Sequence, residues 1–301
     1  MFILRTKLNK IAVTLQGILN KNNLRIMNLL SWGIVAKPFR LCLAVGLFLT
    51  AVSCNGMFSS VYDDADDGGK TEDKESQISM DASSWQNWYY ISFDSLETLR
   101  QQGDMARLKY AQSHFTPYPI PMTPTGEKTT SHPTEGTTGL YTYWYDIFGQ
   151  GLSKNEYRAF TPTAAQPEPD QWDLAIHYAD ARTNGGAVLK TSYTSIDDLP
   201  ASSAYFAGTE FTPDEWSEKD VWADQTEQLN KLLGCQGIKI NKVLSSWLQV
   251  ELKSLPPTFT LDSHVFLVKL KNGRMAAVQL QNYMNANGDK GMLTINYKYP
   301  Y

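Results

Sequence analysis

One stretch, residues 172–188 with the sequence WDLAIHYADARTNGGAV, restricts the fold more than any other part of the chain. Apolar side chains occupy every second position from Trp172 to Tyr178, which is the period of a β-strand buried on one face. The following Asn184-Gly185-Gly186 supplies residues that tolerate the positive φ of a tight turn. The stretch therefore predicts a strand that ends in a turn, within a protein built from sheets.

The end of the chain carries the same pattern three times. Residues 265–270, 275–283 and 293–299 have the composition of strands. Asn272-Gly273 separates the first two runs and is typical of a two-residue hairpin turn. We expect these runs to form an antiparallel meander.

Between these regions the signals are mixed. The aromatic run 140–148 predicts a strand with residues 157–160 as its hairpin partner, and residues 238–251 also have strand composition. Residues 95–110 predict a short helix that Gly103 interrupts, while the prolines of residues 116–139 predict an irregular excursion. Thr212, Pro213 and Glu215 have the order of a helix N-terminus, which predicts a helix over residues 212–233.

Charge and cysteine content narrow the class of protein. The chain has 27 basic and 31 acidic residues, and seven of the basic residues lie in residues 1–53, which hold no acid. The remaining chain has a net charge of about −11, which disfavours binding to nucleic acid phosphates. After removal of an N-terminal signal only Cys54 and Cys235 of the three cysteines remain, so no disulfide is expected within the body.

The N-terminal region predicts export and lipidation. Residues 41–53 form an apolar run that follows Lys37 and Arg40, and it is too short to span a bilayer as a helix. Ala51-Val52-Ser53-Cys54 resembles a bacterial lipobox, in which the cysteine thiol receives the lipid. We therefore assign residues 1–53 as a signal peptide, with Met27 as an alternative start, and Cys54 as the lipidation site.

Residues 54–77 are predicted to form an acidic linker. Seven Asp and Glu side chains and few apolar ones leave this segment too little surface to bury, so it should be a disordered tether. Such an acidic run resembles a surface-export signal of Bacteroidetes lipoproteins. A purely solubilising linker is the alternative.

Three residues of the central stretch invite a catalytic interpretation. On one strand Asp173 and His177 would share a face and Asp180 would point to the other, so a triad is not expected. A structural His177, bonded to a neighbouring loop, is the stronger interpretation. The other histidines, His114, His132 and His264, lack metal-ligand spacing. We expect neither an enzyme nor a metal site, and keep a hydrolase only as a third interpretation.

The central motif, with its W-D-L-A-I-H core, D-x-R and T-N-G-G turn, resembles the signature of the HmuY family, haem-binding surface lipoproteins of the Bacteroidetes. Other pieces follow in the family's order, among them Met80-Asp81-Ala82-Ser83, Ser246-Trp247-Leu248 and Pro256-Pro257-Thr258-Phe259. The resemblance implies an all-β, antiparallel, sandwich-like single domain over residues 78–301. An insertion would occupy residues 100–140 approximately.

The resemblance also implies a haem site, but the ligands do not carry over. In HmuY relatives a His pair or a Met pair binds the iron, one ligand before the Trp-Leu segment and one just after it. Here neither residues 192–246 nor residues 247–253 contain His or Met. Several side chains could bind iron in their place: Cys235, Tyr205, Tyr193, Met105, His114, Met122 and His132. The cofactor-binding residues therefore stay unassigned.

By resemblance, the expected function is that of a lipid-anchored outer-membrane protein, exposed at the surface, that captures haem. It would pass haem to a TonB-dependent outer-membrane receptor. The alternative is an accessory or adhesion lipoprotein that binds a protein or glycan partner through its aromatic side chains and its insertion.

Overall fold

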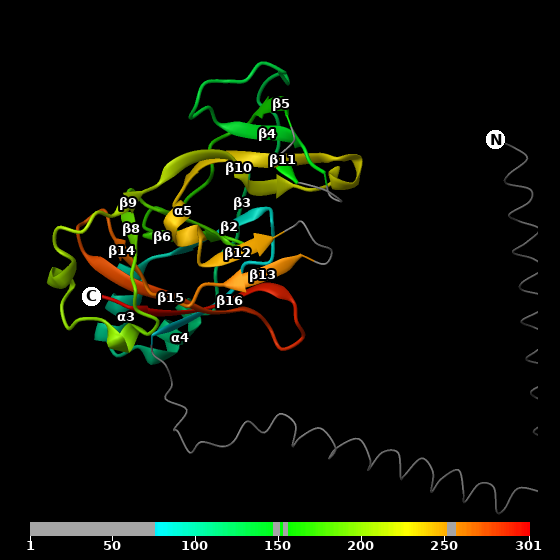
Figure 1. Ribbon diagram of the computed structural model, residues 1–301. Coiled ribbons are helices and arrows are strands. Elements are labelled where there is room, and N and C mark those ends of the chain that lie inside the picture. The colour runs from blue at the N-terminus through cyan, green and yellow to red at the C-terminus, as the bar shows by residue number, and fades with distance from the viewer. Residues whose placement is uncertain (1–75, 147–150, 153–155, 252–256) are drawn as a thin grey trace, which may run out of the picture. The chain divides into compact units, whose positions relative to one another are not determined.

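The computed structural model describes residues 76–146, 151–152, 156–251 and 257–301 (Figure 1). The predicted signal peptide, Cys54 and all but the last residues of the predicted linker lie outside these ranges. Every strand pair in the described residues is antiparallel. The prediction of an all-β, antiparallel fold is therefore confirmed.

The largest sheet joins the two ends of the described chain. Its six strands follow the order β1-β16-β15-β14-β8-β9. They are β1 (Gln77–Asp81), β16 (Lys290–Lys298), β15 (Met275–Met284), β14 (Phe266–Lys269), β8 (Ala187–Lys190) and β9 (Thr212–Pro213). Because β14, β15 and β16 are consecutive neighbours, the predicted C-terminal meander is confirmed, with Gly273 in the turn at φ 82°.

Three smaller sheets complete the fold. One has the order β10-β11-β4-β5, with strands Glu215–Asp224, Leu232–Ile240, Gly139–Trp144 and Tyr157–Pro162. The second has the order β3-β2-β6-β7, with strands Tyr118–Pro119, Asn87–Ile91, Leu174–His177 and Asp180–Thr183. The third is the hairpin of β12 (Leu248–Glu251) and β13 (Thr258–Leu261). In Figure 1 the β12–β13 hairpin lies between the β10–β11 sheet and the large sheet.

The central stretch is a hairpin rather than one strand. β6 ends at His177, and Tyr178 with φ 53° turns the chain so that His177 pairs with Asp180 on β7. The Asn184-Gly185-Gly186 turn then leads to β8, as predicted. The expectation that Asp180 faces away from His177 is wrong, because it assumed an uninterrupted strand.

Two short helices replace the one predicted over residues 95–110. α3 (Phe93–Gln101) begins at Ser92, whose hydroxyl accepts a hydrogen bond from the Ser95 N–H at 3.3 Å. Gly103 then adopts φ 69°, and Asp104 caps α4 (Met105–Ala111) by accepting from the Arg107 N–H. The break at Gly103 follows the sequence because glycine reaches this conformation without steric cost.

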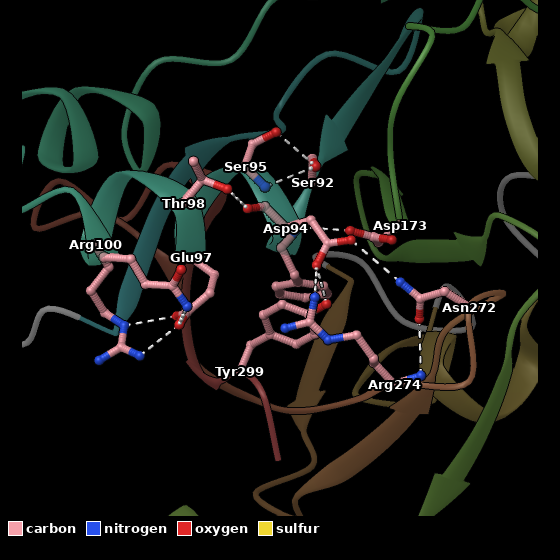
Figure 2. Close-up of polar contacts among 12 residues, drawn as sticks. Ser92, Asp94, Ser95, Glu97, Thr98, Arg100, Asp173, Asn272, Arg274 and Tyr299 are labelled. Atoms are coloured by element: carbon pink, nitrogen blue, oxygen red, sulfur yellow. Dashed lines mark hydrogen bonds and ion pairs between the residues drawn. The ribbon is translucent and has the colours of Figure 1, made fainter.

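Asp94, in the first turn of α3, holds the helix to the C-terminal meander (Figure 2). Its carboxylate accepts hydrogen bonds from Arg274 and Tyr299, and the Asn272 side chain donates to it at 3.3 Å. The Arg274 guanidinium also lies 4.5 Å from the centroid of the Tyr299 ring. These contacts connect residues about 180 positions apart and fix the helix on the sheet.

The helix predicted over residues 212–233 is wrong. This segment contains β9, β10, the single-turn 3-10 helix η4 (Gln228–Asn230) and the start of β11. The Asp214 carboxylate accepts from the Thr183 N–H and hydroxyl at 2.7 and 2.9 Å instead of capping a helix. Val221 and Ala223 are buried at alternate positions against a second cluster of core residues, so tertiary packing outweighs the local N-terminal signal.

The remaining expectations are met in part. β4 and β5 pair as the hairpin predicted from the aromatic run, although residues 147–148 lie outside the described ranges. Residues 238–251 are strand only at their ends, since α5 (Lys242–Ser245) interrupts them. Residues 116–139 are irregular apart from β3, the first residue of β4 and the isolated bridge between Thr129 and Phe160.

The main core lies between the six-stranded sheet, the two helices and the β6–β7 hairpin. Its largest buried side chains include Phe93, Ile176, Trp247 and Phe266. A second cluster around Trp88 and Trp172 connects the β2–β6 sheet to β10 and β11. Burial of these side chains fixes the β6–β7 turn, around which the candidate site forms.

Candidate functional site

A cavity of about 660 Å³ lies beside the turn of the β6–β7 hairpin, between the β10–β11 and β12–β13 hairpins. Aromatic side chains from four separate segments line it, namely Trp85, Tyr178, Trp222 and Phe259. We call this cavity the aromatic pocket. The rings of Trp85 and Tyr178 are stacked with centroids 3.9 Å apart, and Trp222 follows Trp85 at 5.9 Å. Flat apolar surfaces of this kind suit a flat aromatic ligand.

Hydrogen bonds from the core position the two stacked rings. His177 Nε2 lies 2.8 Å from the Trp85 carbonyl oxygen and donates to it, which fixes the segment before β2. The indole N–H of the buried Trp247 donates to the Ala179 carbonyl at 2.9 Å, which holds the turn that carries Tyr178. Phe259 on β13 lies 6.4 Å from the Tyr178 ring and stacks on Tyr283.

One side of the aromatic pocket is polar. Asp180, Asp220, Lys219 and Lys242 contribute charged groups, and the buried amide nitrogen of Gln225 has no hydrogen-bond partner among the described residues. Lys242 Nζ lies 2.9 Å from Glu215 and 4.0 Å from Asp220. Its hydrogen bond to Glu215 raises the pKa of Lys242, so its ammonium group is charged at neutral pH.

Of the three residues that suggested catalysis, the structure brings His177 and Asp180 together and places Asp173 elsewhere. His177 Nδ1 lies 3.6 Å from Asp180 Oδ2, and burial raises the pKa of Asp180 while His177 opposes that rise. Asp173 instead accepts a hydrogen bond from the Phe93 N–H at 2.7 Å, next to Asp94 (Figure 2). Burial raises the pKa of Asp173 as well. No triad forms from these residues, and the bond from His177 to Trp85 confirms its predicted structural role.

Both segments in which the family resemblance places iron ligands reach the aromatic pocket. Trp222 comes from the first segment, residues 192–246, and Leu248 and Val250 come from the second. Within the described part of the chain, the lining contains no His, Met or Cys side chain. Tyr178 offers a phenol oxygen, but burial raises its pKa to about 12, so it keeps its proton at neutral pH. The described lining therefore lacks the pair of strong iron ligands that the family resemblance implies.

The side chains that could replace these iron ligands lie elsewhere. Cys235 is fully buried in the β10–β11–β4 sheet, and burial raises the pKa of its thiol well above the ordinary value. His132 Nε2 contacts Glu218 at 2.7 Å, and the His114 ring stacks on Tyr110. Two tyrosines and two methionines also lie outside the lining of the aromatic pocket: Tyr193, Tyr205, Met105 and Met122.

Two further features of the described residues bear on function. These residues include no group of three His, Cys, Asp or Glu side chains placed to hold a metal ion. Among them, no helix has the length and apolar character needed to cross a membrane.

Sequence reasoning missed the pocket walls. Trp222 was assigned to a helix, Tyr178 to the buried face of a strand, and Trp85 to no element. The turn that brings these side chains together is made by Tyr178 at positive φ, and a turn residue other than Gly or Asn gives no signal in a sequence.

Antiparallel sheets around an aromatic pocket define a β-sheet protein with a concave aromatic site. The family model of the HmuY protein matches residues 84–297, and the chain therefore belongs to the HmuY family. Proteins of this family are binding proteins rather than enzymes. No curated protein matches the chain significantly.

One solved structure has the same fold, and two others show weaker similarity. Apo PinO from Porphyromonas gingivitis is 21% identical, with 74% of this chain and 95% of that chain covered and a TM-score of 0.52. A candidate HmuY-like haem-binding protein from Bacteroides vulgatus is 26% identical over 75% of this chain and 91% of its own, with a TM-score of 0.48. A candidate lipoprotein from Bacteroides fragilis is 27% identical over 75% and 89%, with a TM-score of 0.47.

Proposed function

We propose that this protein captures haem in the aromatic pocket while it is anchored to the outer membrane and exposed at the cell surface. It then passes haem to a TonB-dependent receptor. The observation that carries the proposal is the position of the pocket, since the two segments that supply iron ligands in the haem-binding HmuY family meet there. The aromatic side chains of the lining supply the apolar ring surface that a porphyrin requires.

In this pocket the macrocycle supplies most of the binding energy. Trp85, Trp222 and Phe259 bury apolar ring surface against the ligand, which stabilises the complex in proportion to the area removed from water. Lys219 and Lys242 line the same pocket and offset the negative charge of the haem carboxylates. The iron receives no His or Met from the described lining, so capture by this chain depends on aromatic stacking.

Titration of the full chain with haem tests the proposal. We expect a saturable change of the Soret band at one equivalent, without the band shape of a bis-His or bis-Met complex. Trp222→Ala removes one wall and should weaken binding by about tenfold or more, as buried aromatic contacts do at other binding sites.

A matched control is Trp144→Ala, since Trp144 lies on β4 outside the pocket and is 36% exposed. It should bind haem as the wild-type chain does. A featureless change that never saturates would contradict haem capture and favour the alternative, an accessory lipoprotein. Equal affinity of the Trp222 and Trp144 variants would place haem outside the aromatic pocket.

A further inference from the structure

A second cavity, of about 510 Å³, shares no lining residue with the aromatic pocket within the described chain. The turn between β7 and β8 forms one wall, and Trp216 on β10 with Gln236 on β11 forms another. Glu168 and Trp172, from the segment before β6, close the cavity. We call it the polar pocket.

The polar pocket contains a buried guanidinium group. Arg182 is 7% exposed, and its Nη2 donates to Glu168 Oε1. The rings of Trp172 and Trp88 lie 4.8 and 5.4 Å from its guanidinium carbon, so Arg182 is held between aromatic rings. Its buried Nε–H has no partner among the described residues. A buried donor without a partner is unfavourable, and an oxygen atom supplied by a ligand removes that penalty.

A second donor in the same lining has no partner. The indole N–H of Trp216 is buried and unbonded in the described structure. The acceptors around it are already in use. Gln236 accepts from the Trp88 indole at 2.8 Å and donates to Gln166 at 2.9 Å, and Asp214 accepts from Thr183 and Asn241. The buried side-chain atoms of the polar pocket that have no hydrogen-bond partner are therefore N–H donors, which require ligand oxygens.

The charges of the lining decide between an anion and a neutral ligand. Arg182 and Lys239 are balanced by Glu168 and Asp214, all of which line the pocket. With two cations against two carboxylates, the lining has no net positive charge to offset the desolvation of an anion in a partly buried site. A neutral ligand rich in oxygen needs no such charge. The ring of Trp216 adds an apolar face beside these polar groups.

We propose that the polar pocket binds a neutral saccharide. The hydroxyl oxygens accept from the donors of Arg182 and Trp216, hydroxyl hydrogens donate to the exposed side of Glu168, and the C–H face of the sugar ring packs against Trp216. The cavity volume accommodates one or two sugar rings. This site is independent of haem capture, because it uses none of the residues of the aromatic pocket.

Saturation-transfer difference NMR on the full chain, kept soluble in a sugar-free detergent, tests the proposal. The probes are lactose, cellobiose and N,N′-diacetylchitobiose, with N-acetylneuraminic acid as an anionic comparison. We expect saturation transfer to at least one neutral disaccharide. Trp216→Phe keeps an aromatic ring but loses the N–H, and should weaken this binding by about tenfold.

Trp144→Phe serves as the matched control, since Trp144 lines neither pocket, and it should leave saccharide binding unchanged. A thermal melt shows that each variant is folded. Glu168→Gln, which replaces one acceptor oxygen by an amide N–H donor, provides a second test with an expected loss of about threefold. The proposal is overturned if no neutral disaccharide shows transfer, if only N-acetylneuraminic acid does, or if Trp216→Phe and Trp144→Phe bind equally well.

Discussion

At the scale of single residues, the two glycines of the Asn-Gly-Gly motif are required for different physical reasons. Gly185 adopts φ 69°, which a side chain makes costly. Gly186 lies so close to β14 that an added Cβ would come 2.4 Å from the carbonyl oxygen of Lys269. The first glycine is therefore required by the turn, and the second by the close approach of β14.

Gly186→Ala should therefore destabilise the fold by about 2–3 kcal/mol, because the added methyl group overpacks against backbone that cannot move aside. Urea unfolding of both proteins measures the difference. Gly208→Ala is the matched control, since Gly208 has φ 88° and no atom within 4 Å of the added Cβ. It should cost only about 1 kcal/mol. Equal losses for the two variants would show that the contact with Lys269 has no energetic role.

The positions of single residues also explain why the aromatic pocket could not be predicted from the sequence. Trp85, Tyr178, Trp222 and Phe259 are separated by tens of residues, and each has an ordinary interpretation as a core or surface aromatic. They meet only because His177 and Trp247 hold the Tyr178 turn against the segment that carries Trp85. Family resemblance pointed to two segments that reach the pocket, but it supplied no ligand residue, because the expected side chains are absent from the sequence.

At the scale of elements, predictions held where a local signal and the tertiary pairing agree. The C-terminal meander has alternating apolar residues and an Asn-Gly turn, and each strand pairs with its neighbour in sequence. The prediction for the β10 segment was wrong because the Thr-Pro-x-Glu pattern at its start favours a helix. The pairing of β10 with β11 and the hydrogen bond from the Thr183 N–H to Asp214 favour a strand instead. Such long-range partners are not visible in a single sequence.

A pH-dependent contact connects two of these elements. Asp262, between β13 and β14, pairs with Lys190 at the end of β8 and with His264. Burial by itself raises the pKa of Asp262, but hydrogen bonds from Lys190 and His264 outweigh burial and lower it to about 2. Because this value is below the ordinary 3.8, the contact stabilises the fold at neutral pH, and the stabilisation is lost as pH falls from about 4 to about 2.

Chemical unfolding at pH 5 and at pH 2 should show this loss. The wild-type chain should lose about 2 kcal/mol more than Asp262→Asn between the two pH values, since the variant has no carboxylate to protonate. Glu127→Gln, an exposed loop change, should follow the wild type. If Asp262→Asn and wild type lose the same free energy, the ion pair does not stabilise the folded chain.

At the scale of the whole molecule, lipidation of Cys54 would place the folded body outside the cell, with residues 54–77 as its tether. Cys54→Ala should move the protein from the membrane fraction to the soluble fraction, because several buried methylenes at about 0.8 kcal/mol each hold a lipidated protein to a bilayer. Immunoblots of the two fractions measure the distribution.

Cys235→Ala controls for loss of a cysteine, since Cys235 is buried in the sheet and has no route to a lipid. This variant should stay with the membrane. Retention of the Cys54 variant there after a high-salt wash would show that another part of the chain provides the anchor.

The side chain of Trp247 does not line the aromatic pocket. Its indole N–H donates to the carbonyl of Ala179, the residue that follows Tyr178 in the pocket lining. The shape of the aromatic pocket therefore depends on the packing of the core. A ligand bound there would meet a surface that forms when the protein folds, and little further ordering would be needed on binding. Changes deep inside the protein, selected for stability alone, would alter at the same time what the protein can hold.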